Sequence, residues 1–361
     1  MNAPVAREKL AVSELSVFDH PEFKNHEQVI FGHDAASGLR TIIAVHDTRL
    51  GPALGGCRMW AYKNDAQALT DALRLSRGMT YKNSLAGLDL GGGKAVIIAD
   101  PRTGKTDAML AAFGRQVDRL AGTYITAEDV GISSKDMEIV AGETRYARGT
   151  KATGLGDPSP YTALGVFIGL KAAVAHYFGS DDLTGRIVAI QGLGHVGMYL
   201  AEDLHNAGAR LVVADIHTPS VERAVSEFGA RSVDPKTIHT VEADVFAPCA
   251  LGAGLNDGTI PELGAPVVAG AANNQLAEER RHGEELKKRG ILYAPDYAIN
   301  AGGVISIALA QPGTGDAKVR DKVVAIGQTL THIFERAAAL DLPTQTVADQ
   351  IAEERLALAT R

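Results

Sequence analysis

The sequence has few of the features that mark secreted, membrane or nucleic-acid-binding proteins. It holds two cysteines, Cys57 and Cys249, in unrelated contexts without metal-ligand spacing, which argues against a disulfide framework and a zinc site. It has no run of about eighteen apolar residues, no signal-peptide pattern at its N-terminus and no cluster of Lys and Arg. We therefore expect a cytoplasmic protein that binds no metal, no membrane and no nucleic acid.

Glycine and an ordinary apolar content are what the sequence does have. Its 361 residues include 39 glycines, 45% are hydrophobic and 22% are charged. The length suggests two domains, and the composition is that of a globular protein with a sizeable core. The glycine content favours many tight turns and backbone that faces a ligand.

The glycines are informative in residues 186–215. A predicted strand, residues 186–191, runs into GLGHVG, a predicted helix and strand follow, and Asp215 ends that second strand. This is the full context of a dinucleotide-binding loop. The glycines let a pyrophosphate reach the helix N-terminus, and Asp215 would bond the ribose hydroxyls and repel a 2′-phosphate, which favours NAD over NADP. The loop residues assigned to the cofactor are Gly192, Gly194, His195, Val196 and Gly197, although a solvent-facing helix residue is the better interpretation of His195.

A second glycine-rich stretch, GLDLGGGKAVIIADP at residues 87–101, lies in the first half of the chain. Three glycines run into Lys94, and an apolar strand-like segment, residues 95–99, follows. We expect the glycines to form a turn that leaves room for a ligand. Burial disfavours the ammonium form of such a lysine, so it can act as a base. Alone, the motif more often means a plain turn with a solvated lysine.

The neighbours of Lys94 strengthen the functional interpretation. Lys82 lies near the end of a helix predicted over residues 64–85, although a lysine there also suits the helix dipole. Asp129 follows a predicted strand, where α/β proteins often place catalytic groups, although an N-cap would explain it too. The turn GPALGG, residues 51–56, could offer backbone N–H groups to a carboxylate or be a plain loop.

The sequence predicts an α/β fold of two domains separated by a cleft. We expect residues 1–149 to be a substrate-binding and catalytic domain, and residues 150–339 a Rossmann-type NAD-binding domain. Residues 151–160, rich in Gly and Pro, would be the hinge, and the last helix, within residues 340–361, would pack back on the first domain. Polar residues at the hinge and at predicted strand ends are further candidates for cofactor binding: Thr162, Asn273 and Asn300. Any one of these asparagines could equally brace a turn.

Seven motifs together resemble a known family. In order they are GPALGGCRMW, LSRGMTYKNSLAGLDLGGGKAVIIADP, YITAEDVG, GLGHVG, DVFAPCALG, VVAGAANNQL and ILYAPDYAINAGGV. They span about residues 26–355 and resemble the glutamate/leucine/phenylalanine/valine dehydrogenases, most of all the leucine type. The resemblance implies a homo-oligomeric, NAD-dependent amino acid dehydrogenase of branched-chain amino acid catabolism.

The resemblance also implies a role for each matching residue. Lys82 would hold the substrate carboxylate with help from the backbone at Gly55 and Gly56, Lys94 would be the general base for the attacking water, and Asp129 would move protons at the substrate nitrogen. Thr162 and Asn273 would touch the nicotinamide end, and Asp215 the adenosine ribose. Four apolar residues would line the side-chain pocket: Leu54, Ala127, Val304 and Ile307.

An apolar pocket predicts a branched aliphatic L-amino acid as substrate, because a second carboxylate would need cationic or hydroxyl partners. A phenylalanine or valine dehydrogenase is the alternative within the family. A regulatory NAD-binding protein with a dead site is disfavoured, because Lys82, Lys94 and Asp129 are all present. The chain departs from the family at Cys57, at Ile132 and in a shortened segment after Ile307, so no oligomer size is carried over.

Overall fold

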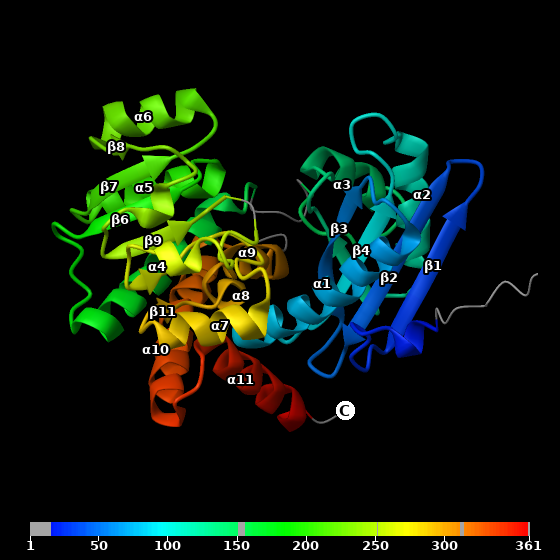
Figure 1. The fold of residues 1–361 in the computed structure, drawn as a ribbon. Coiled ribbons are helices and arrows are strands. Elements are labelled where there is room, and N and C mark those ends of the chain that lie inside the picture. The colour runs from blue at the N-terminus through cyan, green and yellow to red at the C-terminus, as the bar shows by residue number, and fades with distance from the viewer. Residues whose placement is uncertain (1–15, 151–155, 251, 311–313, 360–361) are drawn as a thin grey trace, which may run out of the picture.

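The protein consists of two α/β units, each built around its own sheet (Figure 1). The computed structural model describes residues 16–150, 156–250, 252–310 and 314–359. The five-stranded sheet has the order β1-β2-β4-β3-β5 and the six-stranded sheet the order β11-β10-β9-β6-β7-β8. The predicted α/β fold is confirmed. The predicted hinge falls partly on residues 151–155, which lie outside the described residues, so the boundary at residue 149 stays a prediction.

The first sheet is mixed and carries helices on both faces. β1 pairs antiparallel with β2 and β2 with β4, whereas β3 pairs parallel with both β4 and β5. Helix α1 covers one face, and helices α2 and α3 cover the other. The elements are η1 (Val17–Asp19), β1 (Gln28–Asp34), β2 (Leu39–Asp47), β3 (Ala53–Trp60), α1 (Asp65–Leu85), β4 (Gly91–Ile98), α2 (Asp107–Asp118), β5 (Tyr124–Ala127) and α3 (Ser134–Ala141).

The glycines before Lys94 form part of a strand, so the predicted turn is wrong. A Cβ atom on Gly92 would stand 2.0 Å from the backbone nitrogen of Thr80 in α1, and one on Gly93 would stand 2.7 Å from the ring of Tyr124. These glycines therefore make room for the protein's own helix and tyrosine rather than for a ligand. GPALGG likewise enters strand β3 at Ala53.

The second sheet is entirely parallel. β6 lies between β7 and β9, so the strand order reverses beside β6, which is where dinucleotide-binding folds hold their ligand. The elements are α4 (Ser159–Phe178), β6 (Ile187–Gln191), α5 (His195–Asn206), β7 (Arg210–Ala214), α6 (Thr218–Phe228), β8 (Arg231–Ser232), η2 (Ile238–Thr240), β9 (Val245–Pro248), η3 (Ile260–Glu262), β10 (Val267–Val268), α7 (Glu279–Lys288), β11 (Leu292–Tyr293), α8 (Asp296–Ile299), α9 (Gly302–Leu309), α10 (Asp316–Leu340) and α11 (Thr344–Leu358).

Helix α4 is long and apolar enough, by length and composition alone, to cross a membrane. In this fold one side of α4 is packed inside the second domain, where Val166, Leu170 and Val174 are fully buried. Its apolar character is accounted for by this packing, as in the core helix of a globular domain.

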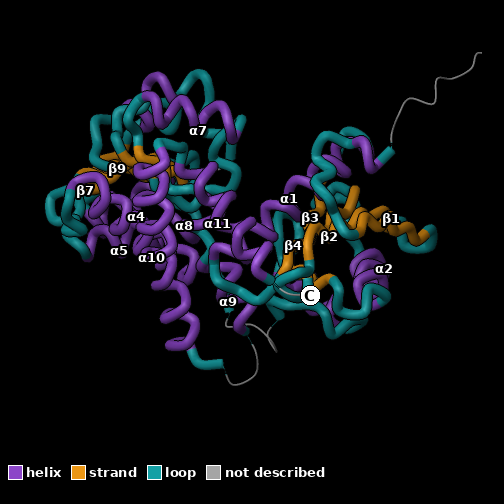
Figure 2. Tube along the Cα trace, turned by 90° about the horizontal axis from the view of Figure 1, so that it is seen from below, coloured by secondary structure: helices purple, strands orange, loops and turns teal. Residues whose placement is uncertain are grey.

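The C-terminal helix α11 packs against α1 of the first domain (Figure 2). Arg355 donates from Nη1 to the backbone oxygens of Ser84 (2.9 Å) and Leu88 (2.8 Å), where α1 ends. Tyr81 donates to the carboxylate of Glu353 at 2.6 Å. The end of α1, which carries Lys82, is therefore held by the last helix of the chain.

Candidate active site

Lys94 projects from β4 on the face of the sheet that α1 covers. It is only 5% exposed, and its ammonium group is paired with the carboxylate of Asp129, which follows β5. Gly56 of β3 permits this approach, because a Cβ atom there would lie 2.8 Å from the Cβ of Asp129. The strand order brings together two residues that the sequence separates by 35 positions.

Asp129 has a second cationic partner that the sequence analysis missed. Arg58 of β3 lies with Nε 3.3 Å from Oδ2 of Asp129, the same oxygen that Lys94 contacts. Burial alone would raise the pKa of Asp129, but the charges of Lys94 and Arg58 outweigh it and lower this pKa to about 2. Asp129 is therefore a carboxylate at any pH near neutrality.

Lys82 lies in the last turn of α1, half-buried and close enough to Lys94 for their charges to interact. Its Nζ donates a hydrogen bond of 3.2 Å to Oδ1 of Asn273 in the second domain. Burial lowers the pKa of Lys82 to about 8, and the charge of Lys94 acts in the same direction, while that of Asp296 opposes it. A cation beside the Lys94–Asp129 pair suits the carboxylate of a small substrate.

The loop that carries Asn273 is braced by two buried residues. Asn300 donates from Nδ2 to Oδ1 of Asn273 (2.9 Å) and to the backbone oxygen of Ala271 (3.0 Å). Asp296 accepts from the backbone N–H of Asn274 at 2.7 Å. Asn300 thus contacts the loop that was predicted to touch the cofactor. Asp296 was missed, although its place at the start of α8, three residues after the end of strand β11, was a usable signal.

In the predicted dinucleotide loop some glycines are required by close packing, and one faces open space. Gly192 has φ +101°, and a Cβ atom on Gly197 would stand 2.1 Å from the oxygen of Gly192. Around Gly194, which caps α5, no heavy atom lies within 4 Å of where a Cβ would be. This open N-terminus, with no side-chain cap, fits the phosphates of a dinucleotide.

Asp215 stands at the end of β7, beside this loop. Its carboxylate accepts hydrogen bonds from the backbone N–H groups of Leu193 (2.5 Å) and His217 (2.7 Å). The acidic group is thereby fixed next to the glycines, where a ribose would be recognised. Within the loop, His195 is exposed and Val196 is half-buried in the first turn of α5.

The remaining predicted residues are divided between the two domains. Gly55 and Gly56 pair with β5, while the pairing between β3 and β4 skips both and resumes in the same register at Cys57. Thr162 donates to the oxygen of Pro158 at 3.1 Å. The pocket residues Leu54 and Ala127 are buried in the first domain, and Val304 and Ile307 lie one turn apart on α9, so their joint pocket stays a prediction. The shortened segment after Ile307 includes residues 311–313, outside the described residues.

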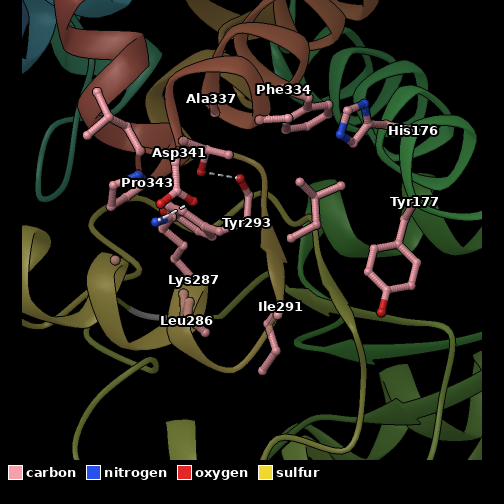
Figure 3. A pocket seen from close by; sticks show the side chains of 16 residues that line it. His176, Tyr177, Leu286, Lys287, Ile291, Tyr293, Phe334, Ala337, Asp341 and Pro343 are labelled. Carbon is pink, nitrogen blue, oxygen red and sulfur yellow. Dashed lines mark hydrogen bonds and ion pairs between the residues drawn. The ribbon is translucent and has the colours of Figure 1, made fainter.

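Two other features of the second domain carry none of these residues. A pocket of about 300 Å³ lies between α4, α7, α10 and β11, with Lys287 and Asp341 paired at 2.8 Å in its wall (Figure 3). Asp257, His282 and Glu285 lie close enough together to hold a metal. However, His282 accepts at Nδ1 from a backbone N–H, so Nε2 carries the proton and bonds Asp257 instead.

Comparison with known proteins covers nearly the whole chain. The family model described as "Glu/Leu/Phe/Val dehydrogenase, dimerisation domain" matches residues 26–146, and the model "Glutamate/Leucine/Phenylalanine/Valine dehydrogenase" matches residues 154–221 and 214–339. Leucine dehydrogenase of Geobacillus stearothermophilus is 52% identical over 344 residues, 95% of this chain and 94% of that protein. Valine dehydrogenase of Streptomyces albus is 47% identical over 344 residues, 94% of each. The crystal structure of L-tryptophan dehydrogenase from Nostoc punctiforme superposes with a TM-score of 0.83 at 46% identity, covering 93% of this chain and 97% of that one.

Proposed function

Because this chain belongs to the glutamate/leucine/phenylalanine/valine dehydrogenase family, we propose that it catalyses the reversible, NAD-dependent oxidative deamination of branched-chain aliphatic L-amino acids. The products are 2-oxo acids and ammonia. The chain is an amino acid dehydrogenase, and leucine dehydrogenases share about half of its residues over nearly the full length. The observation that carries the mechanism is the buried Lys94 paired with Asp129 beside Lys82.

The residues of the site divide the reaction between them. The nicotinamide, when bound, accepts the hydride of the substrate α-carbon. Lys82, in its ammonium form, pairs with the substrate carboxylate and fixes the α-carbon. Lys94, in its neutral form, takes a proton from the water that attacks the iminium carbon, and Asp129 exchanges protons with the substrate nitrogen as the carbinolamine collapses.

The cofactor assignment rests on the open helix end and on Asp215. The pyrophosphate would lie at Gly194, with Gly192 and Gly197 shaping the loop. The ribose hydroxyls would bond Asp215, whose charge repels a 2′-phosphate. Thr162 and Asn273 would meet the nicotinamide end. Measuring kcat/KM with NAD and with NADP tests this: equal use of both cofactors would contradict the role of Asp215.

The substrate assignment rests on the apolar character of Leu54, Ala127, Val304 and Ile307. Each is aliphatic, so the pocket offers no partner for a second carboxylate. A phenylalanine or valine dehydrogenase is the second candidate, favoured by the 47% identity to a valine dehydrogenase. Discrimination per methylene is only about 1–3 kcal/mol, so several aliphatic substrates should be accepted.

The decisive experiment is to mix the protein with NAD and leucine and to follow NADH absorbance. Comparing kcat/KM for leucine, isoleucine, valine, phenylalanine and tryptophan then ranks the candidates. A higher value for an aromatic substrate than for leucine would replace the branched-chain assignment. No turnover of any L-amino acid would refute the enzymatic function.

We also propose that the protein is a cytoplasmic homo-oligomer. The match of residues 26–146 to a domain described as a dimerisation domain supports the oligomer. Light scattering on the purified protein tests it, and a mass of one chain, 37.9 kDa, would contradict it.

A further inference from the structure

Arg58 of β3, the strand between β4 and β5, is a fixed positive charge beside Asp129. Its Nε lies 3.3 Å from Oδ2 of Asp129, and its Nη1 donates to Oδ2 of Asp71 in α1 at 2.9 Å. The side chain is 21% exposed. Although burial works against it, the charges of Asp129 and Asp71 raise the pKa of Arg58. An arginine does not lose its proton in a protein, so this charge is permanent.

A permanent positive charge beside Asp129 is useful because the positive charge of Lys94 cannot be permanent in this reaction. To activate water, Lys94 must be neutral, and Asp129 then loses its strongest counter-charge. Burial favours the protonated form of a carboxyl group. With Lys94 as its sole partner, Asp129 would share one proton with it, and the two groups would titrate as a coupled pair. Separate roles for Lys94 and Asp129 therefore require a second cation that does not titrate.

We propose that Arg58 is a positioning residue for the reaction, a permanent counter-ion that keeps Asp129 ionised and in place while Lys94 releases and regains its proton. This inference rests on the proposed function, in which Lys94 is the general base. Arg58 touches neither substrate nor cofactor in this scheme. It acts on the chemistry through the carboxylate of Asp129 and through the positive potential it adds near Lys94.

Further titratable groups around this arrangement come from α1, β3 and β5 and from the segment that follows β3. Asp71 of α1 is the second anion, and the hydroxyl of Tyr62, after β3, donates to it at 2.6 Å. Lys82, also of α1, is the third cation. Burial raises the pKa of three further groups, which stay neutral near neutral pH: Tyr62, Cys57 of β3 and Tyr124 of β5.

Asp71 and Arg58 should therefore act on Lys94 in opposite directions. Removing the arginine takes a positive charge from the neighbourhood, so Lys94 holds its proton to higher pH. Removing Asp71 takes away a negative charge and frees Arg58 for Asp129, so Lys94 gives up its proton at lower pH. If the Arg58–Asp71 ion pair were purely structural, the two variants should behave alike, because the loss of either partner breaks the same contact.

The test is the pH dependence of kcat/KM for leucine in wild type, Arg58→Met, Arg58→Lys and Asp71→Asn. We expect the midpoint of the acidic limb to move up by about half to one pH unit in Arg58→Met and down in Asp71→Asn. Arg58→Lys keeps the charge, so its midpoint should stay near that of wild type even where kcat falls. The substrate's own titration is common to all four proteins and cancels.

Two results would overturn the proposal: an unchanged midpoint in Arg58→Met, or midpoints that move the same way in Arg58→Met and Asp71→Asn. Should Arg58→Met fail to fold, Arg58→Lys and Asp71→Asn decide the matter, because an unmoved midpoint in Asp71→Asn contradicts the charge argument. A failure of the proposed function can be told apart from a failure of the role of Arg58. In the former case the wild-type protein would lack turnover, or Lys94→Ala would retain it.

Discussion

Lys82 Nζ lies 3.2 Å from Asn273 Oδ1, so a helix of the first domain is hydrogen-bonded to a loop of the second. The same oxygen of Asn273 also accepts from Asn300. In the proposed mechanism Lys82 binds the substrate carboxylate, and its ammonium group has three N–H donors, so it can bond the substrate and Asn273 together. The loop assigned to the nicotinamide end and the lysine assigned to the carboxylate are therefore linked by a direct hydrogen bond.

The state of Lys82 predicts how carboxylate binding depends on pH. Only the ammonium form binds a carboxylate well, and burial lowers the pKa of Lys82 to about 8. We expect the inhibition constant of 4-methylpentanoate, which lacks the amino group, to rise by about tenfold per pH unit well above pH 8. In Lys82→Gln binding should be weak at all pH values. A wild-type constant that is flat from pH 7 to 10 would disprove the assignment.

Replacement of Lys94 should abolish chemistry without unfolding the protein. General acid–base help is worth about 10²–10⁴-fold, so Lys94→Ala should lose at least that factor in kcat for leucine. Asp129 keeps Arg58 as a partner, which limits the structural cost. Circular dichroism and thermal unfolding of the variant provide the control, and near wild-type turnover would rule out Lys94 as the base.

The glycines of the dinucleotide loop offer a matched pair of substitutions. In Gly194→Ala the new methyl group enters open space, so the thermal midpoint should hold while KM for NAD rises. In Gly197→Ala the methyl group would stand 2.1 Å from the oxygen of Gly192, so stability should fall as well. Equal loss of stability in the two variants would show that Gly194 serves packing rather than the cofactor.

Two buried histidines predict a loss of stability in acid. His46 bonds Thr80 at 2.9 Å and lies against His26, and burial lowers its pKa to about 4. In the unfolded chain the imidazole of His46 takes up a proton near pH 6.5. The stability that neutral His46 gives the folded protein is therefore complete above pH 6.5 and is lost as the pH falls towards 4.

This loss amounts to at most about 3 kcal/mol for His46. Thermal midpoints measured from pH 7 to 4 at fixed protein concentration should fall more steeply for wild type than for His46→Gln, whose side chain does not titrate. Burial also lowers the pKa of His26, so part of the acid sensitivity should remain in the variant. Parallel curves would exclude His46 as the source.

Features that depend on nearby residues could be predicted from the sequence. The strand–loop–helix–strand unit of residues 186–215 is one, because its glycines and Asp215 lie close together in the sequence. Helix α11 is another, since residues 344–358 follow Pro343 and keep a helical pattern to the end. The helix predicted over residues 64–85 and the strand predicted over residues 186–191 agree with α1 and β6 to within one residue.

Features that depend on distant residues could not be predicted. Glycines 91–93 read as a turn because the groups that occupy their missing side-chain volume, Thr80 and Tyr124, come from α1 and β5. Arg58 escaped notice because Asp129 lies 71 positions away. The non-sequential order β4-β3-β5 brings the two together, and no local pattern in the sequence reports that order.

The contact of α11 with α1 has a consequence for the way the chain is made. Domains fold from the N-terminus as the chain emerges from the ribosome, yet the end of α1 is held by Arg355, which lies 271 positions after Ser84. A nascent first domain would therefore carry Lys82 on a helix end that still lacks its hydrogen bonds to Arg355 and Glu353. Completion of the catalytic half of the molecule therefore waits for a segment synthesised long after it, and a premature stop before Thr344 would damage the first domain, whose own sequence it leaves intact.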